Sequence, residues 1–163
     1  MVQKAEKIWM DGKLVNWDEA NVHILTHTLH YGCGVFEGIR AYECAGGRSA
    51  VYRLVEHMQR LIDSAHILGM KIPFSREELV QGVLDTLKVN KMKAGYIRPL
   101  VFIGDGVMGV HPGTNPIRVA IATWPWGAYL GDGALEKGIA IKTSSFCRHH
   151  VNAMMTKAKA CGN

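Results

Sequence analysis

Residues 96–103 read YIRPLVFI, an almost uninterrupted apolar run, and this stretch decides the fold class. Its length and its aromatic and β-branched residues predict a buried strand. A glycine-rich stretch follows, Gly104–Gly113, which we expect to be a loop, and after it a second buried strand over Ile117–Thr123. The second half of the sequence therefore predicts two strands joined by a loop.

Two helices are predicted before these strands. Apolar residues recur at helical spacing from Leu54 to Leu68, and Gly69 marks the end of that helix. A second helix is expected after Ser75, because this residue can cap the first turn while Glu78 reaches back to the backbone of the cap. An apolar stripe at helical spacing continues from there.

Shorter strands are predicted nearer the N-terminus. Asp11-Gly12 separates two strand-like runs, and this pair is a strong hairpin signal because the turn needs positive φ twice. Further extended segments are expected at Val35–Phe36, Ile39–Tyr42 and Ser49–Tyr52. Strands in two groups with two helices between them predict an α+β fold, a two-layer domain with an antiparallel-rich sheet and two main helices.

The regular pattern breaks at Trp124–Gly133, which is rich in Trp, Pro and Gly. We therefore expect an N-terminal α+β domain over residues 1–125, an interdomain linker over 126–133, and the start of a second, α/β domain over 134–163. Strand-like alternation resumes at Ile139–Thr143. At roughly 150 residues per domain, 163 residues suggest one domain plus the start of another, so we expect this second domain to be incomplete.

The composition is that of an ordinary globular protein, with 48% hydrophobic and 20% charged residues among 163. It excludes a disordered chain and a disulfide scaffold. The net charge of +5 comes from scattered basic residues, so we expect no nucleic-acid partner. No apolar run approaches the length of a membrane span, and the N-terminus lacks a signal-peptide core. We therefore expect no membrane partner and a cytoplasmic protein whose four cysteines are reduced.

No metal site is predicted. His23, His27 and His30 stand four and three residues apart, but the sequence marks no third ligand and no H-E-x-x-H frame. The glycines of 104–113 match neither dinucleotide-binding nor P-loop spacing.

Two arginines, Arg40 and Arg98, lie inside predicted strands. A charged side chain among apolar neighbours is unfavourable unless it meets an anion. One interpretation is a structural ion pair with Asp or Glu. The other is a clamp for a carboxylate or a phosphate, which the guanidinium fork matches bidentately. The residues alone leave both interpretations open.

Three further basic residues are candidates. Arg60 lies on the first predicted helix, where it either lies on the solvated face or reaches a phosphate. Lys157 and Lys159 lie in a stretch of small and apolar residues. A lysine in an apolar setting loses its proton more easily, and its free amine can attack a carbonyl and form a Schiff base. The alternative is a pair of ordinary surface lysines.

The sequence resembles the branched-chain amino acid aminotransferases, pyridoxal-phosphate enzymes of class IV with the D-amino-acid-transaminase-like fold. Each matching motif is weak alone, and their order along nearly the whole chain makes the resemblance specific. The motifs are Ile8–Gly12, His30–Gly32, Val35–Arg40, Glu56–Leu61, Tyr96–Leu100, Met108–Val110, Pro125–Leu130 and Ala158–Ala160.

The resemblance implies roles for individual residues. Lys159, and not Lys157, takes the position of the lysine that binds the cofactor and moves the substrate's α-proton. Arg60 takes the position that contacts the phosphate of pyridoxal 5′-phosphate. Arg98 takes the position that reads the distal carboxylate of glutamate, and Tyr96 one that helps to hold the α-carboxylate. The resemblance places the substrate side-chain pocket at Tyr31, Phe36, Gly38, Val110, Trp126 and Tyr129, and places Arg40 in its lining without a defined role.

The implied activity is transamination of the L-amino acids Leu, Ile and Val with 2-oxoglutarate. A homo-oligomer is implied, a dimer or larger, in which the neighbouring subunit supplies some pocket residues. The family continues past the printed length with the cofactor-binding domain, so we expect the printed chain to be an incomplete form. The alternatives are another class IV reaction, D-amino acid transamination or aminodeoxychorismate lysis, against which Tyr96–Pro99 argues, and an isolated N-terminal domain without catalysis.

Overall fold

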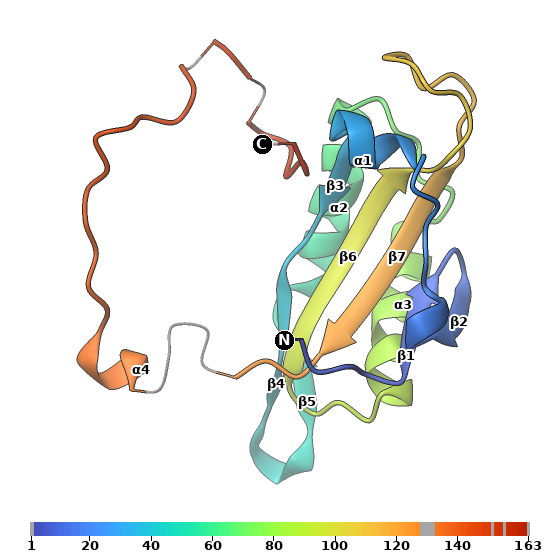
Figure 1. Cartoon of the computed structure of the whole chain (residues 1–163). Coiled ribbons are helices and arrows are strands. Elements are labelled where there is room, and N and C mark those ends of the chain that lie inside the picture. The colour runs from blue at the N-terminus through green and yellow to red at the C-terminus, as the bar shows by residue number, and fades with distance from the viewer. Residues whose placement is uncertain (1, 128–132, 151, 155, 163) are drawn as a thin grey trace.

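The computed structural model describes residues 2–127, 133–150, 152–154 and 156–162 (Figure 1). In these residues, seven strands form one sheet in which all paired strands are antiparallel. The order is β2-β1-β7-β6-β4-β5, and β3 also pairs with β6. The strands are β1 (Lys7–Met10), β2 (Lys13–Asn16), β3 (Gly34–Phe36), β4 (Ile39–Glu43), β5 (Ser49–Val51), β6 (Gly95–Ile103) and β7 (Ile117–Trp124).

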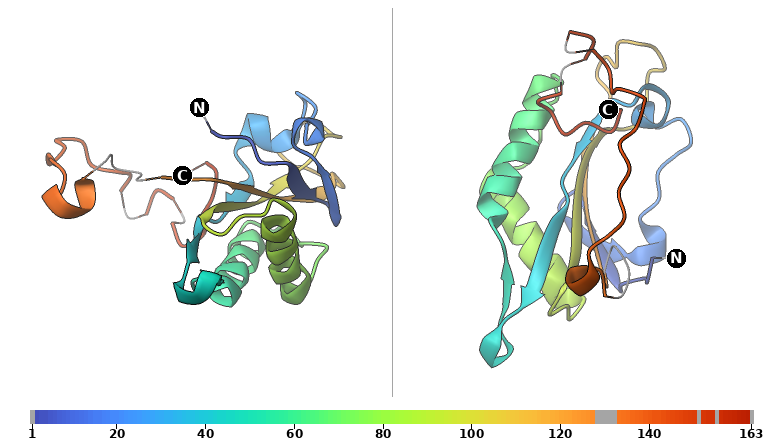
Figure 2. Two further views of the ribbon diagram at one scale, coloured as in Figure 1. Left: turned by 90° about the horizontal axis from the view of Figure 1, so that it is seen from below. Right: turned by 90° about the vertical axis from the view of Figure 1, so that its left-hand side faces the viewer.

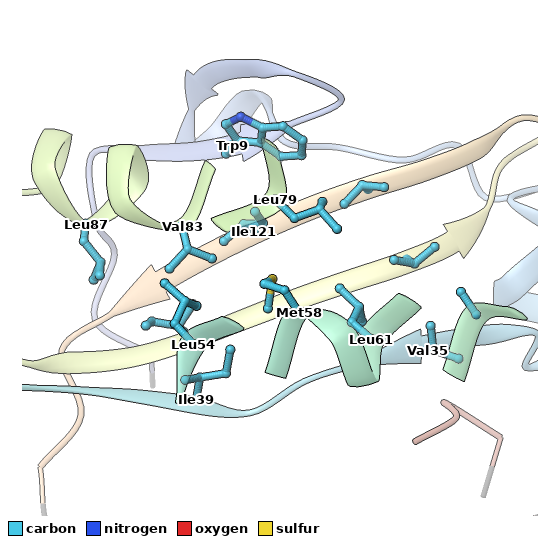
Figure 3. Close-up of a cluster of buried hydrophobic side chains, with 14 of the residues drawn as sticks. Trp9, Val35, Ile39, Leu54, Met58, Leu61, Leu79, Val83, Leu87 and Ile121 are labelled. Atoms are coloured by element: carbon cyan, nitrogen blue, oxygen red, sulfur yellow. The ribbon is translucent and has the colours of Figure 1, made fainter. Parts of the chain in front are cut away.

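Two long helices, α2 (Leu54–Ile67) and α3 (Arg76–Val89), lie on the same face of the sheet (Figure 2). Successive strand residues point to opposite faces, so alternate residues such as Ile97 and Val101 of β6 are fully buried against the helices. Figure 3 shows side chains from both helices meeting those of the strands in this layer, among them Met58 and Leu61. The expected two-layer α+β fold is confirmed.

The local signals in the sequence are confirmed where they are strongest. Asp11 and Gly12 have φ of 49° and 89° and join β1 to β2, as the hairpin turn requires. Gly69, with φ of 73°, follows the end of α2. At the start of α3, the Ser75 hydroxyl accepts from the Glu78 amide at 3.2 Å, and the Glu78 carboxylate accepts from the Ser75 amide at 2.7 Å.

The short elements were harder to predict. The helix α1 (His27–Tyr31) has too few residues to show periodicity in the sequence. The strand expected at Ile139–Thr143 is wrong, because this segment has no regular structure and Ile141 is 88% exposed. The remaining short helices are η1 (Trp17–Glu19), η2 (Ala45–Gly47) and α4 (Ala134–Lys137). None of the helices described here has the length and apolar character needed to cross a membrane.

One edge of the sheet brings distant parts of the chain together. The strands β3 and β4 pair with successive parts of β6 in one register and are separated by Glu37 and Gly38. The segment after β7 leaves the sheet, and its last described residues return beside β3 (Figure 1). There the Phe36 amide donates to the Lys159 carbonyl at 3.1 Å. This edge therefore brings Val35 and Phe36 of β3 beside Lys159 and Ala160. The domain boundaries expected at 125 and 133 stay predictions.

Candidate functional site

The sheet face away from the helices carries a cluster of aromatic side chains beside an arginine. Arg40, Tyr96 and Trp124 stand directly opposite one another on β4, β6 and β7. Trp126, just past β7, places its ring centroid 4.3 Å from that of Tyr96 and 5.7 Å from that of Trp124. Three rings in contact form a rigid apolar wall, of the kind that receives an apolar ligand group.

Arg98 lies within this wall, two residues along β6 from Tyr96. Its guanidinium carbon lies 4.9 Å from the Phe36 ring centroid and 5.3 Å from that of Tyr96. Its Nη2 donates to the Tyr96 hydroxyl at 3.1 Å, while its Nε is buried with no hydrogen-bond partner among the described residues. A buried donor without a partner is unfavourable, so this arginine is suited to an incoming anion.

Lys159 reaches the same place from the other side. Its amide donates to the Ser64 hydroxyl of α2 at 3.1 Å, and its carbonyl accepts from the Phe36 amide. These two bonds fix the backbone between the helix and the sheet edge. The Nζ atom lies 4.7 Å from the Phe36 ring centroid, and the residue is half-buried. Lys157 is exposed and shares none of these contacts.

Arg60 lies on α2 one helical turn before Ser64, so it faces the same edge. Its Nη2 donates to Glu37 Oε2 at 2.7 Å, and its Nε donates to Oε1. His57 Nδ1 lies 2.9 Å from the same Oε2. The Glu37 side chain is wholly buried, whereas that of Arg60 is 55% exposed. Arg60 thus forms an ion pair with the buried Glu37, while more than half of its side chain stays exposed to solvent.

Burial alone would raise the pKa of the Glu37 carboxyl. The hydrogen bonds from Arg60 and His57 outweigh burial and hold this pKa below its ordinary value. In the same pair, the hydrogen bond to Glu37 raises the pKa of Arg60. Glu37 therefore stays ionised and Arg60 stays charged at neutral pH. Sequence reasoning missed Glu37, although a charged residue within an apolar strand segment was a signal that could have found it.

The two strand arginines do not form the ion pairs that were one interpretation of the sequence. Among the described residues, neither Arg40 nor Arg98 contacts an acidic side chain within ion-pair distance. Arg40 is exposed, and its Nη2 donates to the Trp126 carbonyl at 3.2 Å. It therefore ties the segment after β7 to the sheet, and that contact places Trp126 against Tyr96.

Two of the residues assigned by resemblance lie elsewhere in this chain. Tyr31 stacks on His27, with ring centroids 4.4 Å apart, and His27 Nε2 lies 2.8 Å from the Gly109 carbonyl. Val110 follows in the loop after β6 and is 87% exposed. Both lie at the far end of β6 from Tyr96, away from the aromatic wall. Tyr129 lies outside the described residues.

Gly38 is required by close packing in the wall, and this gives a prediction. A Cβ at Gly38 would lie far inside van der Waals contact with the Tyr96 hydroxyl, and the Tyr96 ring already packs against the rings of Trp124 and Trp126. We expect Gly38→Ala to displace Tyr96, change tryptophan emission and lower the unfolding free energy by about 1–3 kcal/mol.

Gly109→Ala is the matched control for Gly38→Ala. A Cβ there would have its nearest neighbour at 3.9 Å, so stability should change by less than about 0.5 kcal/mol. Urea unfolding followed by fluorescence measures both variants, and equal midpoints would contradict the packing argument.

Comparison with known proteins identifies the family of this chain. The Amino-transferase class IV family profile matches residues 34–162. The branched-chain-amino-acid aminotransferase of Pseudomonas aeruginosa is 50% identical over 162 residues, which are 99% of this chain and 52% of that protein. The chain therefore spans about half the length of the curated relatives it matches.

Solved structures match in shape as well as in sequence. The Escherichia coli branched-chain amino acid aminotransferase has a TM-score of 0.94 at 47% identity, over 98% of this chain and 53% of that one. The branched-chain aminotransferase of the thermophilic archaeon Thermoproteus uzoniensis, solved with norvaline, has a TM-score of 0.86 at 40% identity, over 98% of this chain and 52% of that one. The family profile covers most of the sequence that builds the sheet edge and the aromatic wall, and this chain belongs to the class IV aminotransferases.

Proposed function

We propose that the protein carrying this chain transfers amino groups between branched-chain L-amino acids and 2-oxoglutarate with pyridoxal 5′-phosphate as cofactor. One observation carries the proposal. Lys159 is fixed at the sheet edge by Ser64, one helical turn from Arg60 on α2, and its Nζ lies over the Phe36 ring that Arg98 also contacts. A primary amine flanked by two anion-binding groups suits a phosphorylated aldehyde and a carboxylate substrate together.

The residues at this edge fit the cofactor. Arg60 keeps its Nη1 atom without a partner among the described residues, and its side chain is 55% exposed. It would hold the phosphate, and Lys159 would hold the aldehyde carbon. When bound, pyridoxal phosphate withdraws electrons from the substrate's α-carbon. Once the substrate's amine had displaced Lys159 from the aldehyde carbon, the freed Lys159 amine would move the α-proton, since its Nζ lies beside the wall that would orient the substrate.

The aromatic wall accounts for the two kinds of substrate. The rings of Phe36, Tyr96 and Trp126 would enclose a branched apolar chain. Arg98 would bind the distal carboxylate of glutamate or 2-oxoglutarate, since its buried Nε has no partner in the described part of the chain. The Tyr96 hydroxyl, already bonded to Arg98, would help to orient the α-carboxylate. One pocket can thus serve both half-reactions.

The remaining assigned residues support a homo-oligomer. Tyr31 and Val110 lie at the other end of the sheet, exposed by 40% and 87%. We propose that they complete the pocket of a neighbouring copy, and that Tyr129 also contributes to the substrate pocket. Arg40 lines the pocket and supports Trp126 through the Trp126 carbonyl. We propose that a second domain starts at residue 134, after a linker over 126–133. This second domain would supply the remaining contacts to the cofactor.

A substrate panel tests this proposal. We expect the protein carrying this chain to transaminate the L-forms of Leu, Ile and Val with 2-oxoglutarate, and to leave their D-forms unchanged. Product 2-oxo acids are measured by coupled oxidation of NADH. Activity confined to D-amino acids would favour D-amino acid transamination, and pyruvate release from aminodeoxychorismate would favour the lyase. Running the 163-residue chain alone in parallel tests whether it is a domain without catalysis of its own.

A further inference from the structure

The Glu37 carboxylate is a charged group in the interior of the domain. It lies between β3 and β4 with its side chain wholly buried, and the Glu37 amide donates to the Pro99 carbonyl at 3.0 Å, which fixes its backbone to β6. A buried carboxylate is unfavourable unless charged partners satisfy it. Here the anion is buried, while its partners Arg60 and His57 stay 55% and 24% exposed.

Because Glu37 is buried while Arg60 and His57 are partly exposed, Glu37 is the residue of the three whose position is fixed. The Glu37 carboxylate accepts hydrogen bonds from Arg60 Nε and Nη2, which form one edge of the guanidinium group. These two bonds prevent the guanidinium group from rotating freely. The Nη1 end is left directed away from Glu37, without a partner among the described residues. An exposed arginine on a helix samples many rotamers, and binding an anion would then require ordering it.

The bonds between Arg60 and Glu37 also fix the position of the Arg60 guanidinium on α2. Ser64 lies one turn along the same helix face and holds the Lys159 amide. Arg60 and the Ser64 hydroxyl that holds the Lys159 amide therefore lie within one turn of α2.

We propose that Glu37 is a positioning residue that orders Arg60 for the phosphate of pyridoxal 5′-phosphate. This inference rests on the proposed function, since it requires that the site binds this cofactor. Glu37 itself touches neither cofactor nor substrate and acts through Arg60.

The opposite effect is the competing explanation. As a counter-charge, Glu37 would repel a bound phosphate, and its removal would strengthen phosphate binding. Solvent around the exposed Arg60 side chain screens the repulsion between Glu37 and a bound phosphate. The restriction that Glu37 places on the Arg60 rotamers does not depend on charge screening in this way. The two explanations therefore predict changes of opposite sign.

The test compares pyridoxal 5′-phosphate with pyridoxal, which lacks the phosphate. Dissociation constants for both are measured by absorbance on the protein carrying this chain, and their ratio gives the phosphate selectivity. We expect Glu37→Met to lower this selectivity by about five- to tenfold through the lost ordering of Arg60. Methionine fills a similar volume, and both former partners can turn to solvent, so the variant should fold. Glu37→Gln, which keeps one acceptor oxygen, should show a smaller loss.

A double-mutant cycle shows whether Glu37 acts through Arg60. Arg60→Met should lower selectivity further, and adding Glu37→Met to Arg60→Met should change it no more. Glu77→Met is the matched control, because Glu77 forms an exposed ion pair with Arg76 at 2.7 Å on the neighbouring helix α3, and it should leave selectivity unchanged.

The outcomes separate the two proposals. If the unaltered protein prefers pyridoxal phosphate and Glu37→Met keeps or increases that preference, the positioning role is wrong while the proposed function stands. If Glu37→Met weakens both ligands equally, Glu37 is only structural and the positioning role is again wrong. If the unaltered protein does not distinguish the two ligands, the assignment of Arg60 to the phosphate fails and this inference fails with it.

Discussion

Replacing Lys159 by alanine is expected to lower the proposed transamination rate by about 10³-fold, because the variant loses the group that we propose moves the substrate's α-proton. The backbone at this position is held by Ser64 and Phe36 through main-chain atoms, so the substitution leaves those two bonds in place. Folding should therefore be preserved, and the loss should appear in kcat rather than in stability. Steady-state kinetics with L-leucine and 2-oxoglutarate measures it.

Lys157→Ala is the matched control for Lys159→Ala. Lys157 has the same charge two residues away, but it is exposed and lacks the contacts that fix Lys159, so its loss should change the rate by no more than about twofold. Borohydride reduction in the presence of pyridoxal phosphate, followed by peptide mapping, gives a second readout. The label should appear on Lys159. Label on Lys157, or a Lys159→Ala variant with full activity, would remove Lys159 from the mechanism.

Much of the fold follows from local signals in the sequence. The β1–β2 hairpin depends on two positive φ values at Asp11 and Gly12, and only a few residue pairs supply them. The start of α3 depends on reciprocal bonds within four residues. The buried strand β6 is apolar enough to be recognised without its partners. Each of these signals lies within a few residues, so the sequence contains it in full.

The features that were missed depend on long-range contacts. The bond between Glu37 and Arg60 joins residues 23 positions apart, and the bond between Ser64 and Lys159 joins residues 95 apart. No periodicity links such pairs. Ile139–Thr143 shows the converse error, because its alternation suggests a strand that no neighbour in the described chain pairs with. For Lys159 and Arg60, the expected roles came from the resemblance to a family, because residue spacing alone does not indicate them. The structure adds the contacts that hold each residue in place.

Leu61→Ala is expected to lower the unfolding free energy of the 163-residue chain by about 3 kcal/mol, since a fully buried leucine leaves a cavity when it is truncated. Leu61 lies in the layer between α2 and the sheet (Figure 3), where the helix that carries Arg60 and Ser64 packs onto the strands. A change of this size is a large fraction of the roughly 5–15 kcal/mol that stabilises a typical domain. Urea denaturation followed by circular dichroism measures it.

Leu84→Ala is the control for Leu61→Ala, because Leu84 lies on α3 with 44% of its surface exposed and its truncation should cost less than about 1 kcal/mol. Equal losses in the two variants would contradict the assignment of Leu61 to the core. Leu61→Ala also separates folding from the chemistry of the site, because Leu61 faces the core while its neighbour Arg60 is exposed to solvent. Well below the unfolding transition, this variant should therefore keep the phosphate selectivity of the unaltered protein. A loss of selectivity there would mean that the packing of α2, rather than Glu37, orders Arg60.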